Sequence, residues 1–160
     1  MMAVFTAVPL AVFVLCAIVL GAIALGGGLY ETVLVDRVWP GNPAIIQPSR
    51  GGINRGLFWA PIHIVYEVAL LVSAWAVWGD AFARGCIIVA LIAHFASRAW
   101  SFAYFIPKAL WFEKAGDLTE EQSRLARRWI QLSRCRPVLE ALAIISECAV
   151  IVHFATAVPR

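Results

Sequence analysis

The sequence predicts an all-α protein: an integral membrane four-helix bundle with an interfacial amphipathic helix before the fourth span. Of its 160 residues, 62% are hydrophobic and 14% are charged, and the mean hydropathy is +0.81. Soluble domains contain about 45 to 50% apolar and about 25% charged residues. A helix that crosses a bilayer needs about 20 consecutive apolar residues, and the chain holds four such runs. These observations exclude a water-soluble globule, and the length favours one four-span domain over residues 1–160.

The four spans are expected at about residues 3–30, 57–78, 86–107 and 137–158. The first run ends in the flexible stretch Gly26-Gly27-Gly28. A secretory signal would carry positive charge before a shorter apolar core. Because no Lys or Arg precedes Arg37, we expect this run to be a retained membrane helix.

Positive charges predict the orientation of the bundle. The segment between spans one and two carries three of them, Arg37, Arg50 and Arg55, and the segment between spans three and four carries seven: Lys108, Lys114, Arg124, Arg127, Arg128, Arg134 and Arg136. Cytoplasmic loops carry the excess of Lys and Arg, so we expect both segments in the cytoplasm and both termini outside, by default in a bacterial inner membrane. The net charge of +3 then reflects topology, and no binding to nucleic acid is expected.

The segment over residues 31–56 is rich in Pro and Gly, which predicts an irregular, turn-rich connection. Trp39 and Trp59 border it, and Trp at such positions suits the headgroup layer. Connections of this length are commonly functional lids or disordered segments. The apolar and aromatic content of this one favours a lid.

An amphipathic helix is expected just before the fourth span. Thr119 and Gln122 form a capping-box pattern, and Leu125, Trp129 and Leu132 recur at helical spacing among several Arg residues. Such a helix suits the surface of an anionic cytoplasmic leaflet. A solvated linker helix is the alternative.

Ionisable residues inside the spans are the main candidates for function, because a charge in the bilayer is costly and survives where it has a partner or a role. They share helix faces in three groups: His63 with Glu67, His94 with Arg98, and Glu140 with Glu147. At a rise of 1.5 Å per residue from the expected cytoplasmic ends, Glu67, Arg98 and Glu147 fall at one depth of about 14 to 15 Å. His63 and His94 lie on either side of that layer. The pattern predicts a buried polar site.

The predicted catalytic residues are His63, Glu67, His94, Arg98 and Glu147. We expect His63 to act as a general base or ligand, Glu67 to orient it, and Arg98 to stabilise a developing oxyanion. The predicted substrate-binding residues are Trp59, Tyr66, Trp100, Tyr104 and Glu140. Two structural alternatives stay open: Glu67 with Arg98 as an ion pair that fixes helix register, and the aromatic residues as plain core.

Several short motifs resemble the anthrone-oxygenase-like family of small membrane proteins. They are Gly26-Gly27-Gly28-Leu29-Tyr30, Phe105-Ile106-Pro107, Arg128-Trp129 and Ser133-Arg134-Cys135-Arg136, within the four-span layout. The resemblance implies oxidation of polycyclic aromatic anthrones without an established cofactor, and it carries over no catalytic residue. The architecture is also similar to that of the styrene oxide isomerases, which would imply a haem held by His63 or His94.

The residues do not determine the cofactor, which could be haem, a metal ion or no cofactor at all. Two His and two Glu suit iron, copper or manganese, but there is no Glu-x-x-His signature, and Arg98 beside the carboxylates opposes a dication. Cys16, Cys86, Cys135 and Cys148 form no Cys-x-x-Cys pair. We therefore assign no metal ligand.

The sequence favours a membrane enzyme that acts on a small lipophilic, and in one reading aromatic, substrate by oxygenase- or isomerase-type chemistry. The alternatives are a membrane accessory or structural protein and a small proton-coupled transporter. The expected partners are membrane lipid and the small lipophilic molecule, and a homo-oligomer is left open.

Overall fold

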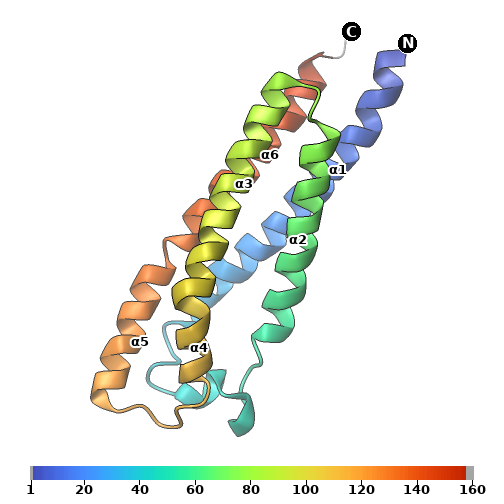
Figure 1. Cartoon of the computed structure of the whole chain (residues 1–160). Helices are drawn as coiled ribbons and strands as arrows, with labels where there is room; N and C mark the ends of the chain where they lie inside the picture. Colours follow the sequence, from blue (N-terminus) through green and yellow to red (C-terminus); the bar gives the residue numbers. More distant parts are fainter. Residues whose placement is uncertain (1, 158–160) are drawn as a thin grey trace.

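The computed structural model describes the backbone of residues 2–157 and the side chains of residues 11–157. The described chain is all-α (Figure 1). Its α-helices are α1 (Met2–Tyr30), α2 (Gly56–Ala76), α3 (Ala81–Trp100), α4 (Ile106–Phe112), α5 (Glu120–Ser133) and α6 (Arg136–Ala157). Two π-helical turns, Glu31–Val35 and Ser101–Phe105, follow α1 and α3, and short 3₁₀ turns occupy Pro43–Ile46 and Pro48–Arg50.

Four long helical segments form the bundle. In the described part of the chain, the segments Ala11–Val35, Gly56–Ala76, Ala81–Phe112 and Glu120–Ala157 are long and apolar enough to cross a membrane. Helix α3 packs on α6 and α2, and α1 packs on α2 and α6. Figure 1 shows that α1 begins and α6 ends at one end of the bundle, while the 31–55 segment, α4 and α5 lie at the other. This arrangement agrees with the expectation that both termini share one side.

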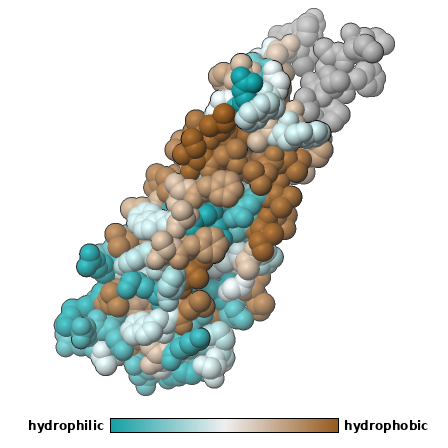
Figure 2. Space-filling model, viewed as in Figure 1, coloured by the Kyte–Doolittle hydropathy of each residue, from teal (hydrophilic) through white to brown (hydrophobic). Residues whose placement is uncertain are grey.

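The side surface of the bundle is apolar. Large side chains face outward all along it, with Leu57, Trp75, Ile92 and Val138 each at least 65% exposed. Figure 2 shows this apolar surface over the upper and middle parts of the molecule and a hydrophilic end around α4 and α5. Because a water-soluble bundle keeps polar residues on its outer face, this distribution suits an apolar surrounding.

Small residues line the core between the long helices. Ala17, Ala74, Ala90, Ala93 and Ala143 are buried there. Small side chains let helix backbones approach closely, as they do in membrane bundles. The space that remains is filled by larger residues such as Tyr66, Leu70 and Ile87, which are also fully buried.

A second core lies at the end opposite the termini. Its buried residues are Trp39, Ile46, Phe105, Phe112, Ala126, Trp129 and Ile130. Trp39 does not face lipid headgroups, because its side chain is 0% exposed and packs on Phe112 and Trp129. The aromatic residues of the 31–55 segment thus belong to a packed core.

Helix α5 begins with the predicted cap. Both hydrogen bonds of the capping box between Thr119 and Gln122 are present. Its apolar face does not lie on a free surface: Trp129 is buried and donates a hydrogen bond to the Phe105 carbonyl at 3.2 Å. Figure 1 shows α5 running beside α4 and nearly in line with α6. The predicted interfacial helix is therefore a packed part of the bundle end.

The 31–55 segment is turn-rich, as predicted, and is fixed to α4 and the residues after it. Gln47 is fully buried and donates hydrogen bonds to the carbonyl oxygens of Phe112 and Gly116, at 3.0 and 2.7 Å. Arg50 pairs with Asp117 at 2.7 Å, and Arg55 pairs with Glu113 at 3.0 Å. These contacts hold the segment as a cover over the second core.

The helices depart from the predicted span ends. The helical path of the third span does not end near residue 107: it continues through the π-helical turn and α4 to Phe112. Pro107 is accommodated because it directly follows the π-helical turn, which already interrupts the regular hydrogen-bond pattern of the helix. The first span likewise continues to Val35, and the expected end of the fourth at residue 158 lies outside the described residues.

Candidate functional site

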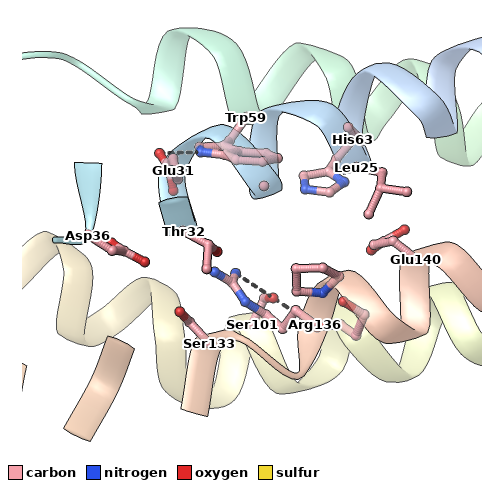
Figure 3. A pocket seen from close by; sticks show the side chains of 14 residues that line it. Leu25, Glu31, Thr32, Asp36, Trp59, His63, Ser101, Ser133, Arg136 and Glu140 are labelled. Carbon is pink, nitrogen blue, oxygen red and sulfur yellow. Dashed lines mark hydrogen bonds between the residues drawn. The ribbon is translucent and has the colours of Figure 1, made fainter. Parts of the chain in front are cut away.

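A small polar pocket lies between the two cores. Its volume is about 40 Å³, which is room for a few water molecules. Its lining includes Leu25, Glu31, Thr32, Asp36, Trp59, His63, Ser97, Ser101, Ser133, Arg136 and Glu140. Figure 3 shows Trp59 and His63 on one side of the pocket and Ser101, Arg136 and Glu140 on the other.

Both π-helical turns contribute to this pocket. The first supplies Glu31 and Thr32, and the second supplies Ser101. A π-helical turn inserts an extra residue into a helix and is frequent at functional sites. Here each turn directs polar side chains from an otherwise apolar helix into the space between the helices.

The carboxyl groups at the pocket already have partners. Each shares a hydrogen bond with a ring nitrogen: Glu31 with Trp59 at 2.9 Å, Asp36 with Trp39 at 3.1 Å, and Glu140 with His94 at 3.0 Å. Asp36 lies just beyond the first span, and its burial raises its pKa to about 6. The three carboxyl groups are thus held in position by aromatic rings.

Two nitrogen-bearing groups at the pocket retain free hydrogen-bonding capacity. Among the described residues, Nδ1 of His63 and Nε of Arg136 are buried without a hydrogen-bond partner. The His63 ring stacks on Trp59 at 5.3 Å, with the planes inclined by 20°. Arg136 donates a hydrogen bond from its terminal nitrogen to the Ser101 hydroxyl at 3.3 Å and lies over the Phe105 ring. An imidazole and a guanidinium are therefore free to contact a ligand.

A second group of ionisable residues adjoins the pocket and links three helices. His94 is fully buried, with Nδ1 3.0 Å from Glu140 and Nε2 3.6 Å from Glu67. Arg98 donates a hydrogen bond from Nε to Glu67 at 2.9 Å. The Tyr66 ring packs edge-on to His94 at 4.7 Å. These contacts join α2, α3 and α6.

The predicted layer of Glu67, Arg98 and Glu147 is correct for Glu67 and Arg98, which contact each other, and wrong for Glu147. Arg98 pairs with Glu67, whereas Glu147 is bonded to the hydroxyl of Tyr66 at 3.4 Å, surrounded by the apolar core. The depth calculation measured Glu147 from Pro137, but the fourth helical segment already begins at Glu120, so α6 starts deeper in the bundle than was assumed. Glu140 is therefore the residue of α6 that meets His94, and Glu147 lies two turns farther, about 10 Å along the helix.

The structure also contradicts the roles predicted for Glu67 and Arg98. Glu67 bonds Arg98, and its contact with a histidine is with His94, so it does not orient His63. Arg98 is not among the residues that line the pocket, and the guanidinium found there is that of Arg136.

The predicted substrate-binding residues separate into two groups. Trp59 and Glu140 line the pocket. Tyr66 is buried in the bundle core, while Trp100 and Tyr104 each pack on Phe105 at 5.1 Å beside the second core. Those three aromatic side chains line neither the pocket nor the cavity described next.

An apolar cavity lies next to the polar pocket, between the end of α1 and the start of α2. Its volume is about 440 Å³, within the range typical of small-molecule sites. The lining residues are Ile23, Gly26, Gly27, Tyr30, Glu31, Val35, Ile53, Asn54, Arg55, Phe58 and Trp59. Glu31 and Trp59 line both spaces, so their hydrogen bond forms part of the wall between them.

Sequence reasoning missed several pocket residues. It assigned Arg136 to topology, and gave no role to Asp36 or Ser101. One signal was present: Arg136 and Glu140 are four residues apart, as are Ser97 and Ser101, which places each pair on one helix face.

The histidines do not fit a haem as they stand. The pocket beside His63 is far smaller than a haem, and the His94 ring is enclosed, with one nitrogen bonded to Glu140 and Nε2 facing Glu67. Among the residues that the structure describes, no three His, Cys, Asp or Glu side chains are grouped to hold a metal ion.

Comparison of the chain with family models, curated proteins and solved structures found no match. The resemblance to the anthrone-oxygenase-like family therefore stays a prediction. The fold and the site define the class coarsely: an all-α protein whose four long helical segments could each span a membrane, with a polar pocket beside an apolar cavity.

Proposed function

We propose that the protein is an integral membrane enzyme that converts a small lipophilic substrate by proton transfer at His63. The observation that carries the proposal is the shared wall of the apolar cavity and the polar pocket. Trp59 belongs to that wall, and His63 stacks on the same indole. An apolar site with a few convergent polar groups is the usual form of a small-molecule site.

The four apolar helical segments support the membrane location. The positive charges of the segments 31–55 and 108–136 favour a cytoplasmic location for that end of the bundle, with both termini outside. A bacterial inner membrane remains our working assignment. The pocket would then open near the cytoplasmic leaflet, where lipophilic molecules partition.

The chemistry follows from which groups are free. The unpartnered Nδ1 of His63 can take a proton from substrate carbon or oxygen, and the imidazolium can return it at a second position. The Arg136 guanidinium would stabilise negative charge that develops on a substrate oxygen. Such a transfer gives an isomerase-type reaction, and the same deprotonation would begin the oxygenase-type reaction implied by the anthrone-oxygenase resemblance.

A structural or accessory role is the second candidate, and a specific observation favours it. Arg98, Glu67, His94 and Glu140 contact one another across three helices, through two hydrogen bonds and the 3.6 Å approach of His94 Nε2 to Glu67. Polar side chains with this arrangement hold membrane helices together. If the ionisable residues only hold the helices together, then the unpartnered nitrogens of His63 and Arg136 take part in no reaction.

Chromatography coupled to mass spectrometry tests the enzyme, because chromatography separates isomers of equal mass. Proteoliposomes that contain the protein are incubated with a lipophilic extract of the host cells, and all extractable compounds are quantified before and after. We expect at least one compound to be consumed and its product formed by the wild type, and neither change with His63→Gln.

His153→Gln is the matched control, because His153 pairs with Asp80 at the other end of the bundle and lines neither space. It should retain conversion. Identical compound profiles for the wild type and His63→Gln would refute the enzyme and leave the accessory role.

A further inference from the structure

We propose that the apolar cavity between α1 and α2 is the binding site for an uncharged lipophilic molecule that carries a hydrogen-bond-accepting oxygen, which Arg55 contacts. This inference rests on the proposed function, because it assigns the chemical class of the substrate and the place, next to the pocket of His63, where the substrate first binds. The binding site can also be tested independently of the enzyme, because binding in this cavity can be measured without turnover.

The cavity is built for an apolar body. Ile23, Val35, Ile53 and Phe58 give it side-chain walls, and Gly26 and Gly27 leave a stretch of α1 without side chains. A Cβ atom on Gly27 would lie 2.5 Å from the Phe58 ring, whereas one on Gly26 would meet nothing within 4 Å. The two glycines therefore differ: one lets Phe58 pack against α1, and the other leaves space open.

The location of the cavity provides access from the side of the bundle. Ile23, Gly26 and Tyr30 on α1, and Phe58 on α2, line the cavity and are exposed. They lie inside two of the segments able to cross a membrane. A lipophilic molecule could therefore enter between α1 and α2 without passing through water.

Arg55 supplies the polar contact. Its side chain lines the cavity and is only 9% exposed. One terminal nitrogen donates to Glu113 at 3.0 Å, while Nε is buried without a partner among the described residues. A buried N–H without a partner is costly, and an oxygen atom of a ligand would satisfy it.

Charge balance indicates that the ligand is neutral. The charge of Arg55 is already compensated by Glu113, and the Glu31 carboxylate at the shared wall accepts a hydrogen bond from Trp59. An anionic ligand would add a third negative charge to those of Glu113 and Glu31, and a cationic ligand would be repelled by Arg55. A carbonyl or hydroxyl oxygen on an apolar body meets both requirements.

Photolabelling with benzophenone tests the site, because this probe is an uncharged, lipophilic ketone that reacts with nearby C–H bonds under light. The wild-type protein is labelled in phosphatidylcholine nanodiscs over a range of probe concentrations, and the labelled positions are mapped by peptide mass spectrometry. We expect saturable labelling concentrated in residues 23–35 and 53–59. Saturation in the presence of excess lipid separates a small-molecule site from a place filled by phospholipid.

Gly26→Leu fills the cavity without a backbone clash and should reduce this labelling about tenfold or more. Gly85→Leu is the matched control, since it also adds a leucine to a helical glycine with open space around it, in α3 and away from the cavity. Gly85→Leu should label as the wild type does. Thermal melting of both variants checks that each is folded.

Removal of the polar contact is the second variant. The double substitution Arg55→Leu with Glu113→Leu removes both charges together, so that neither is left buried and unpaired. Loss of one ligand hydrogen bond should weaken saturable labelling about threefold to tenfold.

Labelling spread evenly over the exposed faces of all four helical segments, or equal labelling of Gly26→Leu and Gly85→Leu, would overturn the proposal. The labelling experiment and the conversion experiment can fail independently of each other. Saturable labelling without conversion by any variant would keep the site and reject the enzyme. Conversion that depends on His63 without cavity labelling would keep the enzyme and reject this site.

Discussion

Asp36 gives a quantitative prediction that depends on stability alone. Its carboxyl group is buried at the polar pocket, and burial raises its pKa from the ordinary value of 3.8 to about 6. The unfolded chain therefore releases this proton near pH 4, while the folded protein holds it to about pH 6. Because the unfolded state binds fewer protons between these pH values, folding stability falls as the pH rises through this range.

The size of the effect follows from the same values. One pKa unit corresponds to about 1.4 kcal/mol, so the ionised Asp36 lowers the free energy of unfolding by about 3 kcal/mol above pH 6. The Asp36→Asn variant cannot ionise, and its amide oxygen can still accept the hydrogen bond from Trp39. The variant should match the wild type near pH 4 and exceed it by up to about 3 kcal/mol at pH 7.

Thermal melting of the detergent-solubilised protein between pH 4 and pH 7 provides the assay. We compare the Tm of the wild type with that of Asp36→Asn at each pH, because the contributions of the other titrating groups are the same in both proteins and cancel in the difference. Asp117→Asn is the control, since this carboxylate is 86% exposed and should show no comparable divergence. Parallel curves for the wild type and Asp36→Asn would refute the reasoning.

Two further predictions concern the stability of the bundle. Arg98→Leu leaves the Glu67 carboxylate without its hydrogen bond. Because both side chains are partly exposed, we expect the free energy of unfolding to fall by about 1 to 3 kcal/mol, measured by melting. A double variant that also carries Glu67→Leu should recover most of this stability, and equal losses in the single and double variants would contradict the pairing. Gly52→Ala would place a Cβ atom against the backbone oxygen of Ala44, so it should lower stability by about 1 to 3 kcal/mol and speed proteolysis of the 31–55 segment. Gly79→Ala, which meets nothing within 4 Å, should do neither.

Much of the fold could be predicted because bilayer thickness and apolar composition constrain it strongly. Four long apolar runs predict four helical segments, and the Thr119 cap predicts where α5 begins. The continuation past residue 107 could not be read from the sequence, because Pro107 is a normal sign of a helix end and a π-helical turn has no distinctive pattern. The sequence did not predict the packing of α5, because apolar residues recur at the same helical spacing whether that face of the helix is buried against protein or lies on a membrane.

The candidate site was predictable by residue type but not by pairing. Intramembrane His, Glu and Arg residues indicated a polar site, and His63 and Glu140 do line one. Their depths depended on the assumed helix ends, and the start assumed for the fourth span placed Glu147, rather than Glu140, level with the other ionisable residues. Asp36 and Arg136 lie just beyond or at the ends of the expected spans, where a charge usually serves topology, and hydropathy alone gave no sign that the fold buries them.

The most direct test of the account is to identify what co-purifies with the protein. The wild type, Gly26→Leu and Gly85→Leu are purified from the same cells in one detergent, extracted with organic solvent, and compared by quantitative mass spectrometry. We expect an uncharged, oxygen-bearing lipophilic compound to be enriched with the wild type and Gly85→Leu and depleted with Gly26→Leu. The same compounds in equal amounts from all three proteins would contradict it.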